Sequence, residues 1–374
     1  MKTIRKISLG VLLTLWLGLT FSAWFSPAEA VSESERRNLA QLPELSGQTV
    51  LGGSFMTDFE SYTLDQFPLR DTFRRLKALF HYNVLGQLDN NDIYIAQGHA
   101  VGQQYPLHED SVHRAASRFS YLYEKYLKDS GGKLVMAVVP DKGQYLGSGH
   151  LQLDLAAMTR ILAEQMSWAD HVDLTPFLDA ADYYRTDTHW RQERLLDAAD
   201  ALCEALDSEK TDPDAYTATE LERPFYGVYY GQAALALEPD ELIILESDLL
   251  SSCITSVGTM DMQTGEAVYE KLYEGVYDWE KFRGKDMYEG FLSGTQGILR
   301  IDNPNAATDR ELILIRDSFG SAMAPLLVQG YRSVTLVDIR SVQIDLLGRF
   351  VDFADKDVLF LFSTLVLNNS STLK

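Results

Sequence analysis

The stretch ELILIRDSFGSAMAPLL, residues 311–327, combines a strand, a sharp corner and the start of a helix. Its first part is a continuous apolar run of strand length, the kind that is buried on both faces of a parallel sheet. Asp317 and Ser318 follow directly, and Pro325 fits the first turn of the next helix, where a missing N–H is tolerated. The stretch therefore predicts a buried strand that turns sharply into a helix.

A serine at such a corner is well placed for chemistry. Its hydroxyl is exposed at the carboxyl edge of the sheet, where open α/β sheets place their sites. Backbone N–H groups at the start of the helix, including that of Gly320, would point toward an incoming oxyanion. The alternative is that Ser318 or Ser321 only caps the helix, as serines often do. The corner alone leaves both interpretations open.

Strands and helices alternate along the chain from about residue 109. Such alternation predicts an α/β fold with a doubly wound, mostly parallel sheet and helices on both faces. The expected buried strands are 134–140, 311–317, 334–338 and 357–362, and the expected helices are a stretch that ends at Gly131 together with 151–167 and 191–206.

The domain organisation follows from the same patterns. Residues 31–100 contain amphipathic helical spacing, and we expect a helical and extended segment that packs on the main domain. Residues 101–374 form the expected α/β domain. Within it, residues 207–310 are rich in acids and tyrosines, and we expect an irregular insertion with some strands and helices.

The composition is that of a globular protein, with 374 residues of which 46% are hydrophobic. The formal net charge of −21 argues against a nucleic-acid partner, because phosphate neutralisation needs a basic face. We interpret this acidity as a contribution to solubility.

The N-terminus has the pattern of a signal peptide, residues 1–30. Basic residues precede an apolar run at 7–25, and the small residues Ala28 and Ala30 precede an expected cleavage after Ala30. The alternative is an uncleaved membrane anchor, because the apolar run is close to spanning length. Either interpretation predicts an exported protein, extracellular or associated with the cell envelope.

Two cysteines, Cys203 and Cys253, lie beyond this segment. Export allows them to form a disulfide, and two buried, unpaired thiols are the alternative. Their number and spacing do not support a zinc site.

The stretch YYRTDTHW, residues 183–190, holds a candidate acid–base pair. Asp187 and His189 share a side if the backbone is extended. The carboxylate can then accept the Nδ1–H of the histidine and leave Nε2 to act as a base. The alternative is a capping residue beside a surface histidine. A metal site at Asp182, Asp187 and His189 would need further ligands, and none is apparent from the spacing of the other histidines.

Taken in order, these motifs resemble the DHHW family and, more broadly, SGNH-hydrolase-like proteins of the alginate O-acetyltransferase type. DTHW at 187–190 corresponds to the motif that gives the family its name. As in the alginate-type relatives, the Asp-x-His block precedes the serine block, the reverse of ordinary SGNH hydrolases. The other stretches that carry the resemblance are FPLRDTFRRLK (67–77), VVPDKGQYL (138–146), MYEGFLSGTQGILRIDNPN (287–305), ELILIRDSFGSAMAPLL (311–327), VTLVDIR (334–340) and VLFLFSTLVLNNS (358–370).

The resemblance implies Ser318 as nucleophile, His189 as general base and Asp187 as the carboxylate that orients it. It also implies acetyl transfer onto exported polysaccharides, often beside a membrane-bound acyltransferase, and it implies no cofactor. Thr188 stands where many relatives have histidine, and Arg316 stands where they often have lysine. These departures leave the triad complete but leave the choice of substrate open.

Supporting roles are expected for six further residues, each with a structural alternative. Gly294 and Gly320 could supply oxyanion N–H groups, or simply form turns. Arg340 could bind substrate, or pair with Asp338. The substrate-binding candidates are Lys142, for an anionic group, and Tyr184 and Trp190, for stacking on sugar rings; a solvated lysine and core packing are the alternatives.

Two functions are therefore compatible with the sequence. The first is an exported serine-dependent O-acetyltransferase or acetylesterase that acts on an envelope or extracellular polysaccharide through an acyl-serine. The second is a carbohydrate-binding or assembly protein of the envelope with a silent triad. The sequence does not separate transfer from hydrolysis, because these differ only in the acceptor.

Overall fold

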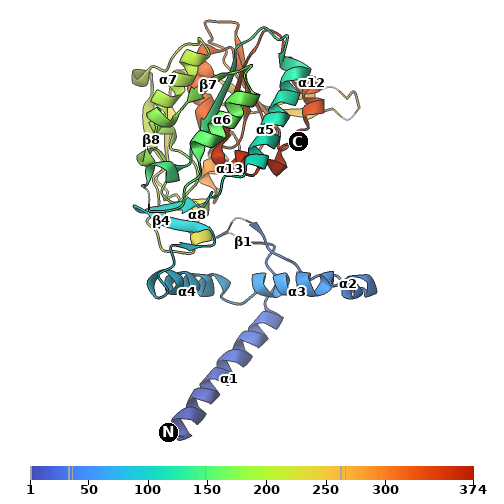
Figure 1. The fold of residues 1–374 in the computed structure, drawn as a ribbon, viewed down its shortest axis with the longest axis vertical. Helices are drawn as coiled ribbons and strands as arrows, with labels where there is room; N and C mark the ends of the chain where they lie inside the picture. The colour runs from blue at the N-terminus through green and yellow to red at the C-terminus, as the bar shows by residue number, and fades with distance from the viewer. Residues whose placement is uncertain (1, 33, 36, 148, 262, 266) are drawn as a thin grey trace. The chain divides into compact units, whose positions relative to one another are not determined.

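The computed structural model describes residues 2–32, 34–35, 37–147, 149–261, 263–265 and 267–374. The chain divides into two compact units (Figure 1). The first comprises Met1–Tyr94 with Val228–Leu237, and the second comprises Ile95–Gly227 with Glu238–Lys374. We had expected the N-terminal segment to extend to residue 100.

The second unit is built on a large mixed sheet. In the part of the chain that the structure describes, this sheet has eight strands, in the order β11-β10-β12-β14-β13-β15-β6-β7. The five strands from β14 to β7 are parallel to one another, and β12, β10 and β11 extend the sheet through antiparallel pairs. Their bounds are β6 Leu134–Val139, β7 Asp170–Asp173, β10 Ile254–Met260, β11 Ala267–Glu274, β12 Ile298–Asp302, β13 Glu311–Arg316, β14 Ser333–Val337 and β15 Asp357–Ser363.

Helices cover both faces of this sheet (Figure 1). Alternate residues of β13 divide between two cores: Leu312 and Leu314 enter one, and Ile313 and Ile315 enter the other. The first core is shared with α7 (Leu196–Ala205) and α11 (Gly320–Met323), and the second with α5 (Glu109–Leu122) and α6 (Leu155–Gln165). The expected α/β fold is confirmed. Strands buried on both faces carry nearly continuous apolar runs, which explains why the sequence indicates them clearly.

The region 207–310 differs from the expected irregular insertion. It contributes three strands, β10, β11 and β12, to the central sheet itself. Strand β11, AVYEKLYE, lies at the edge of the sheet and is mostly exposed. Some of the acids and tyrosines that suggested irregular structure belong to this exposed edge. Strand β7, DHVD, forms the opposite edge and is too short and charged to be recognised from the sequence.

The remaining elements of the second unit connect these layers. The expected helix before Gly131 is α5, which continues into a π-helical turn at Tyr123–Leu127. The others are β5 His99–Gly102, β8 Thr217–Glu220, β9 Ile243–Glu246, α9 Asp248–Ser252, α10 Trp279–Phe282, α12 Leu347–Phe350 and α13 Thr364–Leu367.

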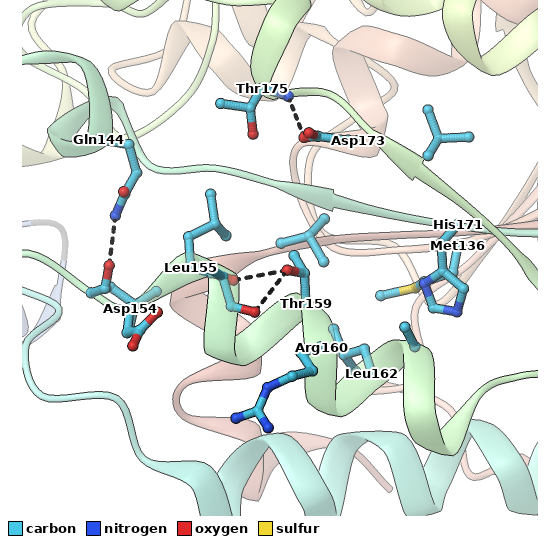
Figure 2. A pocket seen from close by; sticks show the side chains of 15 residues that line it. Met136, Gln144, Asp154, Leu155, Thr159, Arg160, Leu162, His171, Asp173 and Thr175 are labelled. Carbon is cyan, nitrogen blue, oxygen red and sulfur yellow. Dashed lines mark hydrogen bonds between the residues drawn. The ribbon is translucent and has the colours of Figure 1, made fainter.

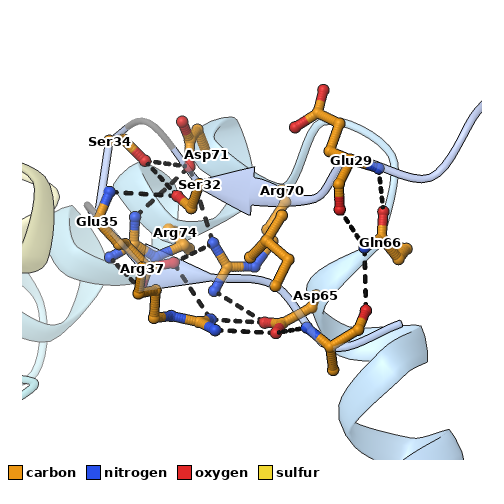
Figure 3. Close-up of polar contacts among 12 residues, drawn as sticks. Glu29, Ser32, Ser34, Glu35, Arg37, Asp65, Gln66, Arg70, Asp71 and Arg74 are labelled. Carbon is orange, nitrogen blue, oxygen red and sulfur yellow. Dashed lines mark hydrogen bonds and ion pairs between the residues drawn. The ribbon is translucent and has the colours of Figure 1, made fainter. Parts of the chain in front are cut away.

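The first unit consists mainly of helices. Helix α1 is long and apolar enough over Ile4–Phe25 to cross a membrane, and none of that segment is buried. An ion-pair network among Glu35, Asp65 and neighbouring arginines joins its later segments (Figure 3). The bounds are α1 Lys2–Phe25, β1 Val31–Ser32, β2 Arg37–Asn38, α2 Gly47–Leu51, α3 Ser54–Asp65, α4 Arg70–Asn83, β3 Asp89–Asn90, β4 Ile93–Ala96 and α8 Val228–Ala233.

Candidate active site

Strand β13 ends in a corner that a buried carboxylate holds in place. Asp317 accepts hydrogen bonds from the backbone N–H and hydroxyl of Ser363, at 2.8 and 2.6 Å, and from the N–H of Phe319, at 3.0 Å. It therefore joins the ends of the parallel neighbours β13 and β15. Ser318, the next residue, is partly exposed among buried neighbours. The corner thus presents one hydroxyl at the carboxyl edge of the sheet.

The stretch 183–190 folds back on itself as a tight loop. Tyr183 and Trp190 form an antiparallel bridge, and the N–H of Tyr184 donates to the carbonyl of His189 at 3.1 Å. The buried carboxylate of Asp240 accepts from the N–H of residue 185 and from both the N–H and the hydroxyl of Thr186, at 2.6 to 2.8 Å. These bonds fix the backbone on either side of Asp187.

The loop and the corner bring Asp187, His189 and Ser318 together. Oδ1 of Asp187 lies 2.6 Å from the ring nitrogen Nδ1 of His189. The same oxygen accepts a hydrogen bond from the backbone N–H of His189 at 3.1 Å. Nε2 of His189 lies 2.8 Å from the Oγ of Ser318. The aspartate is 1% exposed and the histidine side chain 14% exposed. A continuous hydrogen-bonded chain therefore runs from a buried carboxylate to a hydroxyl that is open to solvent.

Two further hydrogen bonds attach the loop to the corner. The indole N–H of Trp190 donates to the carbonyl of Phe319, and the amide of Gln192 donates to the carbonyl of Ala322, each at 3.1 Å. All four residues are buried. Because these bonds are shielded from water, they hold the histidine in register with the serine.

Tyr288 is a site residue that the sequence analysis missed. Its ring stacks on the imidazole of His189, with centroids 3.7 Å apart and an interplanar angle of 9°. Its hydroxyl donates to the carbonyl of Ser318 at 3.3 Å. Burial raises the pKa of Tyr288 well above its ordinary value, so the phenol stays protonated. The available signal was its place in MYEGFLSG, one of the stretches that carry the resemblance.

Arg316 is buried beside the corner and was noted in the sequence only as a departure from relatives. One of its terminal nitrogens donates to the carbonyl of Asp317 at 3.3 Å, while its Nε and Nη2 atoms have no hydrogen-bond partner. Burial lowers the pKa of this guanidinium, an effect that the carboxylates of Asp338 and Asp317 oppose.

The structure places Lys142 differently from the expected substrate-binding position. The side chain is fully buried, and its amine donates to the carbonyl oxygens of Tyr184 and Asp187, at 2.8 and 2.6 Å. Burial lowers the pKa of Lys142 to about 8. Lys142 therefore holds the loop that carries Asp187 and does not face an anionic substrate.

The aromatic candidates also have structural positions. Tyr184 and Trp190 are fully buried, so neither ring face is available to a sugar. Tyr184 packs edge-on against Phe225, with centroids 5.0 Å apart. Trp190 packs against Phe319 in the same way, at 5.4 Å. The alternative of core packing describes both.

The three supporting candidates are likewise engaged within the protein. The N–H of Gly320 donates to the carbonyl of Asp317 at 3.1 Å, and that of Gly294, a turn residue with a φ of +70°, faces the carbonyl of Phe291 at 3.5 Å. Arg340 forms a two-pronged ion pair with Asp338, at 2.7 and 2.9 Å. In this structure none of the three is aimed at the serine hydroxyl.

The two cysteines do not form the disulfide that export would allow. Cys203 and Cys253 are free and buried. Burial raises the thiol pKa of Cys203 to about 11 and that of Cys253 to about 12. Both are therefore unreactive packing residues.

A cavity lies in another part of the described chain than this site, and the described residues form no cluster of metal ligands. Among the residues that the structure describes, no group of three or more His, Cys, Asp or Glu side chains could hold a metal ion. A cavity of about 700 Å³ lies between α6 and the strands β6 and β7 (Figure 2). Its lining includes Met136, Arg160 and His171 but not the three hydrogen-bonded site residues.

Comparison with known proteins places part of this chain in a known family model. Residues 177–337 match the family model described as DHHW protein. The resemblance to the DHHW family is confirmed. The matched segment begins just before the loop with Asp187 and His189 and ends beyond the corner with Ser318. No curated protein matches the chain.

Two solved structures share the fold at low sequence identity, and a third has a lower structural similarity. A DHHW family protein from Eubacterium siraeum is 21% identical, with a TM-score of 0.61 over 76% of this chain and 95% of its own. PatB1 of Bacillus cereus, solved with a sulfonyl adduct, is 15% identical, with a TM-score of 0.58 over 74% of this chain and 97% of its own. The O-acetyltransferase domain of Pseudomonas putida AlgJ is 16% identical, with a TM-score of 0.44 over 74% of this chain and 92% of its own.

Proposed function

We propose that this protein is an exported serine-dependent O-acetyltransferase or acetylesterase that acts on a cell-envelope or extracellular polysaccharide. The observation that carries the proposal is the chain of hydrogen bonds from Asp187 through His189 to Ser318, with distances of 2.6 and 2.8 Å. Nucleophile, base and orienting carboxylate are the three groups that acyl transfer through a serine requires.

In the first step the oxygen of Ser318 attacks the carbonyl carbon of an acetyl ester. Nε2 of His189 takes the serine proton as the new C–O bond forms, and the Asp187 carboxylate stabilises the resulting imidazolium. Collapse of the tetrahedral intermediate breaks the bond to the leaving alcohol, which receives the proton from His189. The products of this step are an acetyl-serine and the free alcohol.

In the second step a sugar hydroxyl or a water molecule attacks the acetyl-serine. His189 removes the proton of the attacking group and returns a proton to Ser318, which restores the starting state. A sugar acceptor gives O-acetyl transfer and water gives hydrolysis. His189 and Ser318 are partly exposed, as attack by either acceptor requires.

The structural relatives supply supporting chemistry. PatB1, which has a TM-score of 0.58, was solved with a sulfonyl adduct. A sulfonyl adduct forms when a nucleophilic group displaces the leaving group of a sulfonyl reagent. By analogy, we expect the hydroxyl of Ser318 to react with reagents of this class.

Export and the acetyl donor complete the proposal. Residues 1–30 would direct export, either as a signal peptide cleaved after Ala30 or as a retained membrane anchor. A membrane-bound acyltransferase is the expected partner that supplies acetyl groups, and the polysaccharide is the expected acceptor.

Labelling with a serine-reactive fluorophosphonate tests the proposal. The wild type should label and Ser318→Ala should not. Ser321→Ala is the matched control, because Ser321 lies in the same corner but is buried, and it should label like the wild type. If the folded wild type neither labels nor cleaves a chromogenic acetyl ester, the silent carbohydrate-binding protein becomes the better description.

A further inference from the structure

Helix α4 in the first unit turns its polar face toward the protein. Arg70 and Arg74 pair with Glu35, and Arg74 also donates to the carbonyl of Gly231 at 2.9 Å (Figure 3). On the same side, Ala78 is fully buried. The hydroxyl of Tyr82, one turn further on, donates to the carbonyl of residue 93 at 2.7 Å. The contacts of α4 within its unit are therefore mostly polar.

The opposite face of α4 is apolar and exposed. Spacings of three and four residues place its members on one stripe of the helix and its flanks. They are Leu69, Phe73, Leu76, Phe80 and Val84, with exposed fractions of 66%, 43%, 62%, 50% and 66%. A helix on the surface of a globular protein normally buries its apolar stripe and exposes its polar one. The amphipathicity of α4 is thus inverted, and we call this stripe the outward face.

The preceding helix, α3, adds aromatic side chains to this apolar surface. Phe55 stacks on Phe59 with centroids 5.7 Å apart, and Phe59 lies 6.1 Å from Tyr62. Phe67, in the turn before α4, packs edge-on against Phe73 of the outward face at 5.5 Å. Exposed apolar surface of this kind marks a site of interaction with a protein or a membrane.

Charge and chain position favour a membrane as the occupant. Arg75 neighbours Leu79 at one margin of the outward face, and Lys77 neighbours Phe73 and Phe80 at the other. Long cationic side chains beside an apolar stripe can reach lipid phosphates while the stripe enters the acyl region. Arg70 and Arg74 are engaged with Glu35 on the opposite side, so the cations of α4 beside the outward face are Arg75 and Lys77, of which Lys77 also donates to Asn91 at 3.2 Å. These two cations complement an anionic lipid surface.

Helix α1 supplies continuity with the bilayer. Its apolar segment of 22 residues would extend about 33 Å, close to the thickness of a hydrocarbon core. Residues 26–53 connect it to α3. Whether or not α1 is cleaved after export, the export pathway brings the neighbouring helices to a membrane surface.

We propose that the outward face of α4, together with the aromatic side chains of α3, lies in the interfacial layer of a lipid bilayer. The helix lies along the membrane plane, with its apolar stripe toward the acyl chains and the Glu35–arginine network toward the other segments of the first unit. This inference concerns the first unit; it rests on the export proposed above but not on the reaction proposed for Ser318.

Nitroxide labels on the full-length chain test this proposal. The protein is reconstituted into vesicles of phosphatidylcholine and phosphatidylglycerol, with single labels at Leu76→Cys and Phe80→Cys. References are Leu15→Cys in the apolar helix α1 and Glu164→Cys, which is exposed on α6. The wild type measures background labelling, because its own cysteines are buried. Accessibility to oxygen, which partitions into lipid, is compared with accessibility to a water-soluble nickel chelate.

The expected result is that the labels at 76 and 80 favour oxygen over the chelate severalfold more than the label at 164 does. Values equal to those of the label at 164 would overturn the proposal. Exclusion of both probes at 76 and 80, relieved by dilution to one chain per vesicle, would also overturn it, because a second copy of the chain would then cover the face. Each variant is shown to be folded by wild-type reaction with the fluorophosphonate and by a wild-type melting temperature.

Discussion

The imidazole of His189 lies face to face with the phenol ring of Tyr288, at a centroid distance of 3.7 Å and an angle of 9°. The stack leaves both ring nitrogens free for their in-plane partners, Asp187 and Ser318. Tyr288 therefore fixes the plane of the imidazole, while Asp187 fixes its rotation within that plane. Such a pair of constraints aligns the base with the nucleophile before substrate binds.

Replacing the stacked ring should reduce turnover. Tyr288→Leu removes an aromatic contact worth about 1 kcal/mol, and we expect kcat for acetyl-ester cleavage to fall roughly tenfold. Tyr288→Phe keeps the stack and loses the hydrogen bonds of the hydroxyl, including the 3.3 Å bond to the Ser318 carbonyl, so it should retain most activity. Equal losses in the two variants would assign the effect to the hydroxyl and contradict a positioning role for the ring.

Gly227 lies so close to the loop of residues 183–190 that a side chain at position 227 should displace Asp187. A Cβ at this position would be 2.3 Å from the Cβ of Asp187 and 2.4 Å from its Cα. We expect Gly227→Ala to lower kcat at least tenfold and to cost about 1–3 kcal/mol of stability. Gly149→Ala is the control, because no atom lies within 4 Å of its added Cβ. Steady-state kinetics and thermal melting check both variants, and unchanged kinetics in Gly227→Ala would contradict the prediction.

Thr188, the residue between Asp187 and His189, should be dispensable for ester cleavage. It is 7% exposed, and its hydroxyl has no hydrogen-bond partner within the protein. Thr188→Val has nearly the same shape and removes only this hydroxyl. We expect kcat within about twofold of the wild type and a stability change below about 1 kcal/mol. A large loss of kcat/KM with one acceptor sugar would instead assign the hydroxyl to substrate binding.

The buried amine of Lys142 should make stability depend on pH. Its pKa is lowered from 10.5 to about 8, so between these values the unfolded chain binds a proton that the folded protein has released. The free energy of unfolding contributed by this residue therefore rises with pH across that window. The free energy of unfolding of the wild type, minus that of Lys142→Met, should rise by roughly 2 kcal/mol from pH 8 to pH 10. Urea titrations at several pH values measure it, and a constant difference would contradict the predicted burial of charge.

The sequence predicted the centre of the fold well and its edges poorly. The apolar runs of β6, β13, β14 and β15 are buried on both faces, so successive apolar residues indicate a buried strand. The edge strands β7 and β11 are exposed on at least one face and carry charged residues. Their membership in the sheet depends on pairing with distant strands, which local patterns do not encode.

The candidate site divides in a similar way. Asp187, His189 and Ser318 were named from motifs whose local backbone already suggested their chemistry, and the structure brings them within hydrogen-bonding distance. Lys142, Tyr184 and Trp190 were candidates for substrate contact with structural alternatives, because the sequence of a polar or aromatic residue beside a motif does not show whether it is buried. The stack of Tyr288 on His189 joins residues far apart in the chain, so only the tertiary structure reveals it.

In the proposed reaction Ser318 carries the acetyl group between donor and acceptor. Peptide mass spectrometry tests this directly, after brief incubation of the protein with a chromogenic acetyl ester and an acid quench. We predict an acetyl group on the peptide that contains Ser318, its disappearance after a chase with an acceptor or water, and its absence in Ser318→Ala. An unmodified Ser318 peptide, together with ester cleavage by Ser318→Ala at the wild-type rate, would contradict the account.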